Sequence, residues 1–192
     1  MTRIAGALVA LLCAAAPAQA QPRGIDGVPL TKVPRILISV SQSGDARVPL
    51  VHAAVAHWNG ILAGTGSGFR LGPVSLGGGG SGQSGAIVVV LSDAEFVSHV
   101  NRLPGGQGAV VMIRNMNSPP TSLPNVMRNV IAHELGHAIG LPHNSNPALL
   151  MCGRPAPCRP ALFTSQTAHY FPLSGAERSR LLAMYPPGWK SQ

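Results

Sequence analysis

The side chains best suited to chemistry lie within eleven residues, His133 to His143, which read H-E-L-G-H-A-I-G-L-P-H. On a helix, His133 and His137 are four residues apart and share one face, so both can bind the same zinc ion. Glu134 stands beside them, where it can act as a base toward a zinc-bound water. Gly140 tolerates a positive φ, so the helix can end there and the chain can return with His143 as third ligand. Three protein ligands leave the fourth tetrahedral position open, as in a catalytic zinc site.

An alternative is that these histidines are ordinary core residues on an apolar helix face. That interpretation leaves the spacing of the imidazoles unexplained. It would also bury Glu134 without a partner, which costs several kcal/mol or forces the carboxylate to protonate. The sequence therefore favours a metal site.

The spacing H-E-x-x-H-x-x-G-x-x-H resembles the metzincin signature of zinc peptidases. Met151 follows eight residues after His143, and its place resembles the methionine turn of that clan. With Pro147 in between, the short run is most similar to the matrixin branch, the family of the matrix metalloproteinases. The resemblance implies a metalloendopeptidase that hydrolyses peptide bonds with a zinc-bound water assisted by Glu134, the base. It also implies that Met151 lies beneath the metal and is not a ligand.

The same resemblance implies the fold and further site residues. We expect an α/β (α+β) zincin-like fold: a twisted mixed sheet of four to five strands with one antiparallel edge strand and two long helices packed on it. One of these helices carries the H-E-x-x-H motif, and a small C-terminal subdomain holds the methionine turn and a final helix. Substrate would pair with an edge strand containing Ser98, His99 and Val100. Tyr170, in the segment that lines the substrate pocket of matrixins, is a candidate pocket residue.

Local patterns predict where the elements lie. Apolar, β-branched runs predict strands at 35–40, 86–91 and 109–114. Helical spacing predicts helices at 48–62 and from Pro124 through His137, and a capping box of Ser174 and Glu177 opens a last helix. Residues 69–71 resemble the second matrixin strand. The segment 93–102 is open between a helix and the edge strand, and we favour the strand.

The chain begins with a pattern typical of a secretory signal peptide. Arg3 precedes an apolar run, 4–16, and an A-x-A cleavage site follows at 18–20. Thirteen apolar residues fall short of the ~20 that span a bilayer as a helix. We therefore expect a signal peptide at 1–20, an extended arm at 21–34, one catalytic domain at 35–188, and a secreted or periplasmic protein of bacterial type.

Two cysteines remain after the expected signal peptide, Cys152 and Cys158. In an oxidising compartment we expect them to form a disulfide that closes a small loop beside Met151. The alternative, a second metal site, lacks further ligands nearby.

Charge narrows the cofactors and partners. The formal net charge is +8 with six acidic residues, and the basic residues are scattered. Nucleic-acid binding would need a clustered basic stripe with aromatic residues, so a peptide or protein substrate is expected and nucleic acid is not. Calcium needs several carboxylate oxygens, so one zinc ion and no structural calcium is the expectation. We expect a monomer without a membrane span.

Two other functions stay open. In a gluzincin-type peptidase a distant glutamate is the third ligand, and Glu177 is the downstream candidate. An exported zinc-binding module without peptidase activity would have no use for Glu134 beside the open position.

Overall fold

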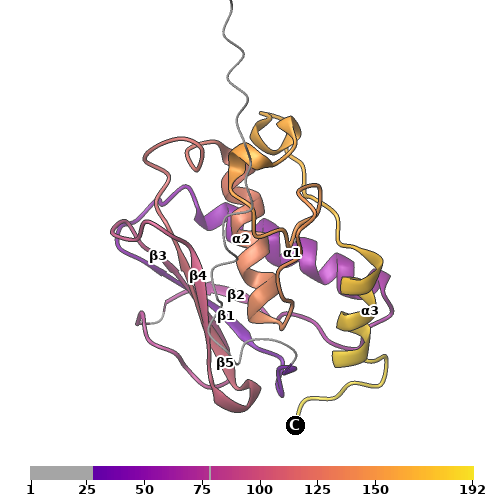
Figure 1. Cartoon of the computed structure of the whole chain (residues 1–192). Helices are drawn as coiled ribbons and strands as arrows, with labels where there is room; N and C mark the ends of the chain where they lie inside the picture. The colour runs from indigo at the N-terminus through magenta and orange to yellow at the C-terminus, as the bar shows by residue number, and fades with distance from the viewer. Residues whose placement is uncertain (1–27, 78) are drawn as a thin grey trace, which may run out of the picture.

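The fold is built on a five-stranded sheet with the order β2-β1-β3-β5-β4 (Figure 1). Its strands are β1 (Arg35–Val40), β2 (Val74–Leu76), β3 (Ala86–Leu91), β4 (His99–Arg102) and β5 (Gly108–Ile113). β4 runs antiparallel to β5, whereas the other neighbouring strands are parallel. The computed structural model describes residues 28–77 and 79–192. It confirms the mixed sheet with an antiparallel edge strand. The predicted signal peptide and the first half of the arm, residues 21–27, lie outside the described residues.

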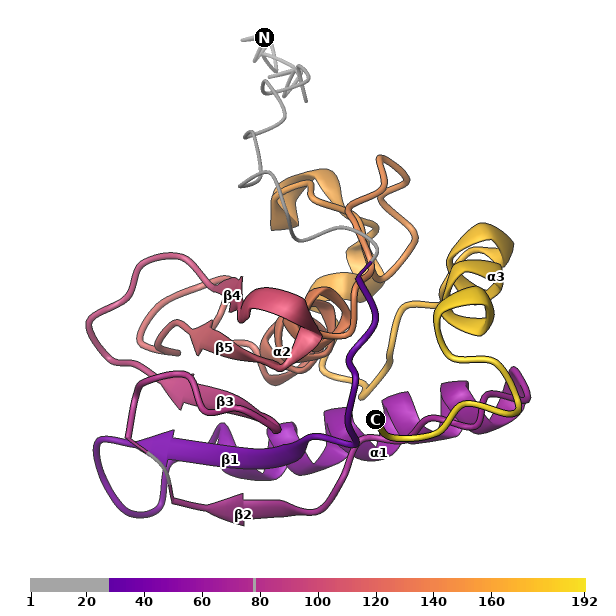
Figure 2. The same ribbon diagram turned by 90° about the horizontal axis from the view of Figure 1, so that it is seen from below.

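Two long helices, α1 (Val48–Gly64) and α2 (Pro124–Ala138), pack on the sheet, and a shorter one, α3 (Gly175–Met184), lies beyond them (Figures 1 and 2). Three single turns of 3₁₀ helix complete the elements: Pro104–Gly106, Ala156–Cys158 and Ala161–Thr164. No helix in the described ranges is long and apolar enough to cross a membrane.

Helix α1 fixes the position of α2 through its buried face. Its predicted apolar side chains are all buried in the main core: Val51, Val55, Trp58 and Leu62. The indole Nε1 of Trp58 donates a 2.8 Å hydrogen bond to the carbonyl oxygen of Ala132, inside α2. Because a buried polar group needs a partner, this bond ties the two helices in one register.

The second strand does not form at residues 69–71, as the sequence suggested, but at Val74–Leu76. The side chain of Asn59 takes both backbone groups of Leu71: Leu71 N donates to Oδ1 at 2.8 Å, and Nδ2 donates to Leu71 O at 3.0 Å. These groups are then not available to a strand ladder, so pairing with β1 begins three residues later, at Val74.

The segment 93–102, for which the sequence allowed a helix or a strand, contains a strand. The hydroxyl of Ser92 accepts the backbone N–H groups of Ala94 and Glu95 at 3.2 Å, as a capping residue would. The chain nevertheless turns without entering a helix, and β4 begins at His99. The edge strand is therefore four residues long and shorter than the segment considered.

The C-terminal helix begins with the predicted capping box. Glu177 N donates to the Ser174 hydroxyl at 3.1 Å, and Ser174 N donates to the Glu177 carboxylate at 2.6 Å. At the other end, the Tyr185 hydroxyl donates to Ile139 O and accepts the backbone N–H of Leu30, both at 2.9 Å. Tyr185 thus joins the arm and the last helix to the end of α2.

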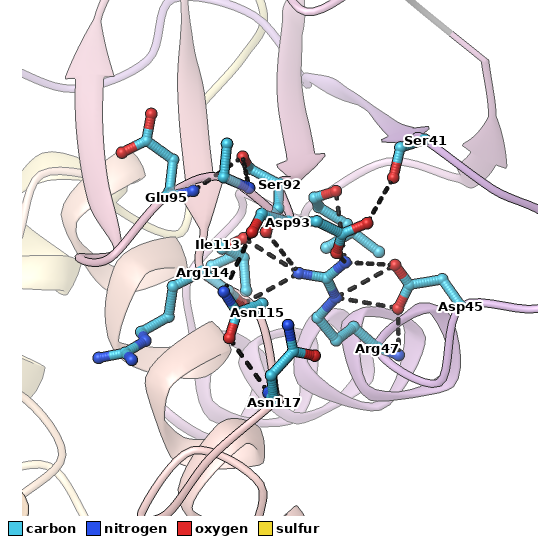
Figure 3. A network of polar contacts seen from close by, with 12 residues as sticks. Ser41, Asp45, Arg47, Ser92, Asp93, Glu95, Ile113, Arg114, Asn115 and Asn117 are labelled. Atoms are coloured by element: carbon cyan, nitrogen blue, oxygen red, sulfur yellow. Dashed lines mark hydrogen bonds and ion pairs between the residues drawn. The ribbon is translucent and has the colours of Figure 1, made fainter.

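A buried arginine, Arg47, contacts residues beyond the ends of the central strands β3 and β5 (Figure 3). We call Arg47 and its partners Asp45, Ser92, Asp93 and Arg114 the Arg47 cluster. The Arg47 guanidinium contacts the carboxylates of Asp45 at 2.5 Å and Asp93 at 2.8 Å. It also donates to Ser92 O at 2.9 Å and Arg114 O at 3.0 Å, beyond β3 and β5. These bonds fix the loop that leads from β3 to the edge strand β4.

Candidate metal centre

The turn after α2 returns the third histidine to the first two. Helix α2 ends at Ala138, and Gly140 follows with φ 103°, a region that glycine occupies without strain. Gly140 N donates to His137 O at 3.0 Å, and Leu141 N donates to Gly136 O at 2.9 Å. The turn predicted from the sequence is therefore formed.

The possible ligand atoms of His133, His137 and His143 lie within 4.8 Å of one another. The Nε2 of His133 is 3.0 Å from the Nε2 of each of the other two rings. Three nitrogens at ~2.0–2.1 Å from a tetrahedral zinc lie roughly 3.4 Å apart, so the cluster has nearly the required size.

Backbone carbonyls fix which nitrogen of two rings points inward. His133 Nδ1 lies 2.8 Å from Leu150 O, and His137 Nδ1 lies 2.7 Å from Leu141 O. A carbonyl oxygen only accepts, so each Nδ1 carries the proton and each Nε2 carries a lone pair. Lone pairs that converge in this way repel one another unless a cation lies between them. The tautomers thus fit a metal ion held by three imidazoles.

Burial keeps His133 neutral, as a ligand must be. Burial is the main cause that lowers its pKa well below 6.5, and His137 adds to the effect, while the bond to Leu150 O opposes it. A neutral imidazole offers its lone pair to a metal without first losing a proton.

Glu134 is the carboxylate of the site. It is 8% exposed and lines the same cleft as the three histidines. No donor in the described part of the chain hydrogen-bonds to it, and burial raises its pKa to about 8. A cation nearby favours the charged form and lowers this pKa again. Without a cation the carboxyl holds a proton near neutral pH, and with one it becomes a base.

Met151 lies against α2, the helix that carries His133 and His137. It is fully buried, and a Cβ on Gly136 would stand 2.5 Å from its Sδ atom and 2.9 Å from its terminal methyl. Glycine at 136 therefore allows a close approach that any larger residue would prevent. The sequence offered no reason for glycine inside this helix, and the structure supplies one.

The three histidines open into a cleft of about 760 Å³, within the usual range for ligand sites. One wall is formed by the edge strand β4 and the residue before it: Ser98, His99 and Val100 all line the cleft as expected. The other walls are α2 and the segment 150–163. In the described sheet no strand pairs with the outer side of β4, so its backbone can accept an extended peptide.

Tyr170 does not line this cleft, contrary to the prediction. Its ring stacks on His57 with centroids 3.9 Å apart, and the Arg128 guanidinium lies 5.5 Å from its centroid. The apolar faces of His57 and Tyr170 bury one another, which turns the tyrosine toward α1. Burial, assisted by the charge of Arg178, lowers the pKa of His57 to about 4.

The disulfide between Cys152 and Cys158 is not formed either. Cys152 is a buried free thiol, and its sulfur accepts the backbone N–H of Arg154 at 3.4 Å. The bond holds the thiol against the backbone of its own loop. Cys158, at the end of the 3₁₀ turn Ala156–Cys158, is disulfide-bonded, and Cys152 is not its partner.

Glu177 is not a metal ligand. One carboxylate oxygen accepts Ser174 N at 2.6 Å, and the other accepts Asn144 Nδ2 at 2.6 Å. Both oxygens serve the helix cap and the loop after His143, which argues against the gluzincin alternative.

Sequence reasoning missed the arginines of the cleft. Arg114, Arg154 and Arg159 all line it, while Glu134 is its only acidic lining residue in the described chain. They come from the end of β5 and from a proline-rich loop, where no local pattern marks an arginine as part of a site.

No protein-family model matches the chain, and no curated protein matches its sequence. Among solved structures it is similar to metalloproteinase-II from Bacteroides fragilis, with a TM-score of 0.52 and 16% identity, over 84% of this chain and 58% of that one. It is also similar to an archaemetzincin from Methanopyrus kandleri, with a TM-score of 0.43 and 15% identity, over 85% of this chain and 97% of that one. The Bacteroides structure shows that the fold is shared with a metallopeptidase.

Proposed function

We propose that the chain is an exported zinc-dependent endopeptidase of the matrixin type, acting as a monomer on protein or peptide substrates. One observation carries the proposal: three imidazole nitrogens converge in a substrate-sized cleft that is also lined by a buried carboxyl, Glu134, to which no described residue donates a hydrogen bond. A structural metal site needs no free carboxyl at its open side.

His133, His137 and His143 would hold the zinc ion. When bound, zinc supplies a Lewis acid that polarises the scissile carbonyl and makes water more acidic. The edge strand would orient an extended substrate across the cleft, with its backbone paired to β4. Glu134 would take the proton of the attacking water and deliver it to the leaving amine.

The matrixin assignment is supported by the spacing from His143 to Met151 and by the antiparallel edge strand beside the histidines. Export is supported by the pattern of residues 1–20.

The test compares wild type with Glu134→Ala and Glu134→Gln for zinc content and for hydrolysis of casein or gelatin. We expect one equivalent of zinc in all three proteins and hydrolysis in the wild type only. Full turnover by Glu134→Gln would show that another group is the base. Zinc without hydrolysis in any of them would favour the zinc-binding module, and absence of zinc would remove the basis of the proposal.

A further inference from the structure

The wall of the cleft holds a cation, Arg159, with which no carboxylate of the described residues forms an ion pair. Arg159 lines the cleft, and its guanidinium carbon lies 4.7 Å from the ring centroid of Phe163 and 4.9 Å from that of Phe171. Stacking on two rings fixes the plane of the guanidinium. The group is thus held in place before any ligand arrives.

Cys152 provides the hydrogen-bond acceptors that the described residues offer to Arg159. Nη1 donates to Cys152 O at 3.2 Å, and the Cys152 side chain is a second neighbour of the guanidinium, although a guanidinium carries five N–H donors. Its Nε is buried without a partner. The ion pairs of the described residues involve Arg47 alone, so no carboxylate neutralises Arg159. A half-buried cation in this state favours an anion that enters the cleft.

The surroundings favour the same kind of ligand. Arg114 and Arg154 line the cleft as well. Lining residues of one charge raise the local concentration of ligands of the opposite charge. Phe96 and Val97 stand exposed at the rim, 79% and 63%, and suit an apolar neighbour of the anionic group.

We propose that Arg159 makes this cleft a binding site for a carboxylate of the substrate, so that the enzyme prefers peptides with an acidic residue beside the bond that it cleaves. The inference rests on the proposed peptidase function. Arg159 acts as a specificity residue, and its planar donors suit the two oxygens of a carboxylate. The carboxylate has two sources, a Glu or Asp side chain and the free C-terminus of a short peptide.

The first measurement separates these sources. Wild type is incubated with a peptide pool in which Glu, Gln, Leu and Lys are placed at each position in turn. Every peptide is made with a free and with an amidated C-terminus. We expect a preference for Glu over Gln of about tenfold at one position beside the cleaved bond, which corresponds to about 1.4 kcal/mol, because a hydrogen bond to a charged group is stronger than one to a neutral amide. A preference for the free acid over the amide would assign the site to the C-terminus instead, and equal rates throughout would refute it.

The second measurement assigns the preference to Arg159. Arg159→Met should cleave Glu and Gln peptides at equal rates. Arg154→Met is the matched control, since Arg154 loses the same charge from the same cleft but is exposed and donates to Ser145 O. It should keep the preference. If Arg159→Met keeps it too, the inference is wrong.

A binding assay makes the result independent of turnover. Fluorescence anisotropy with the zinc-loaded Glu134→Ala protein should show about tenfold tighter binding of the Glu peptide, and the added Arg159→Met change should abolish the difference. Peptide cleavage without any carboxylate preference would refute this inference but not the proposed peptidase function. Arg159-dependent binding without cleavage in wild type would refute the peptidase and leave the carboxylate site intact. Zinc content and thermal unfolding of each variant show that it is folded.

Discussion

Replacing Arg47 with methionine should remove a large part of the stability of the fold. The Arg47 and Asp45 side chains are 4% and 5% exposed, so the substitution leaves the Asp45 carboxylate buried without its cation. It also removes the donors for Ser92 O and Arg114 O, in the Arg47 cluster (Figure 3). Methionine fills much of the same volume, so the effect measures charge and hydrogen bonding more than packing.

The expected size follows from burial. Breaking a buried ion pair by removing one partner costs about 3–5 kcal/mol, against a total stability of about 5–15 kcal/mol for an ordinary domain. The contact with Asp93 adds little, because that side chain is 46% exposed and exposed pairs contribute about 0–1 kcal/mol. We therefore expect Arg47→Met to lower the free energy of unfolding by about 3–5 kcal/mol.

The pKa of Asp45 gives the same contribution a pH dependence. Burial acts to raise that pKa, but hydrogen bonds and charge from Arg47 outweigh it, so the net pKa is lower than 3.8. A carboxyl with a lowered folded-state pKa stabilises the fold above its unfolded value and loses this effect as the pH falls through the folded value. Wild type should thus lose this part of its stability only below about pH 4, and Arg47→Met should show no such loss.

Urea unfolding followed by circular dichroism, at equal zinc concentration for every variant, measures these values. Asp93→Asn should cost less than about 1 kcal/mol, and Arg35→Met, on an exposed arginine, should cost less than about 0.5 kcal/mol. The double variant Arg47→Met/Asp45→Asn should lose less free energy of unfolding than the two single variants lose together, by about 1–3 kcal/mol. A loss below about 1 kcal/mol for Arg47→Met would refute the reasoning.

Three further outcomes follow from the site and its supports. Gly136→Ala should destabilise by about 1–3 kcal/mol and weaken zinc binding, as measured by unfolding and chelator competition, because the new Cβ meets Met151. Unchanged zinc affinity would separate that contact from the metal centre. His57 should make wild-type stability fall by about 1–2 kcal/mol between pH 6.5 and 4, because its pKa is lowered to about 4 in the folded protein and the unfolded chain therefore binds the proton first. This is half of the free energy that the pKa shift corresponds to, since His57 is partly exposed and solvent screens it. His57→Phe, which keeps a ring stacked on Tyr170, should lose this dependence and the exposed His52→Gln should keep it, by acid titration of unfolding. Removing zinc with a chelator should lower Tm, and added zinc should restore it; an equal Tm in both states would contradict a bound metal.

The metal centre could be predicted because its parts are close in sequence. The three histidines and Glu134 lie within eleven residues, on one helix and one turn. Helical periodicity and the conformational freedom of Gly140 then fix their geometry without reference to the rest of the chain. The strands and helices could be predicted for the same reason, since apolar spacing is a local signal.

Two of the errors come from contacts between residues that are distant in the sequence. The strand near Leu71 is displaced by the side chain of Asn59, twelve residues earlier. Tyr170 leaves the cleft because it stacks on His57, which is more than a hundred residues away. Neither partner stands out in the sequence. Both errors follow from a polar or aromatic side chain that competes with the local pattern.

For the proposed peptidase, substrate preference would depend on contacts of this long-range kind more than catalysis would. Water and a peptide bond are the same in every substrate, so one short motif can supply the chemistry. The cleft wall, in contrast, combines β4, α2 and the segment 150–163, where Phe163, Phe171 and Cys152 O hold the guanidinium of Arg159. A substitution in this segment can therefore change the preferred substrate and leave the three histidines as they are. Reaction and specificity are separable in this fold because they rest on different parts of the chain.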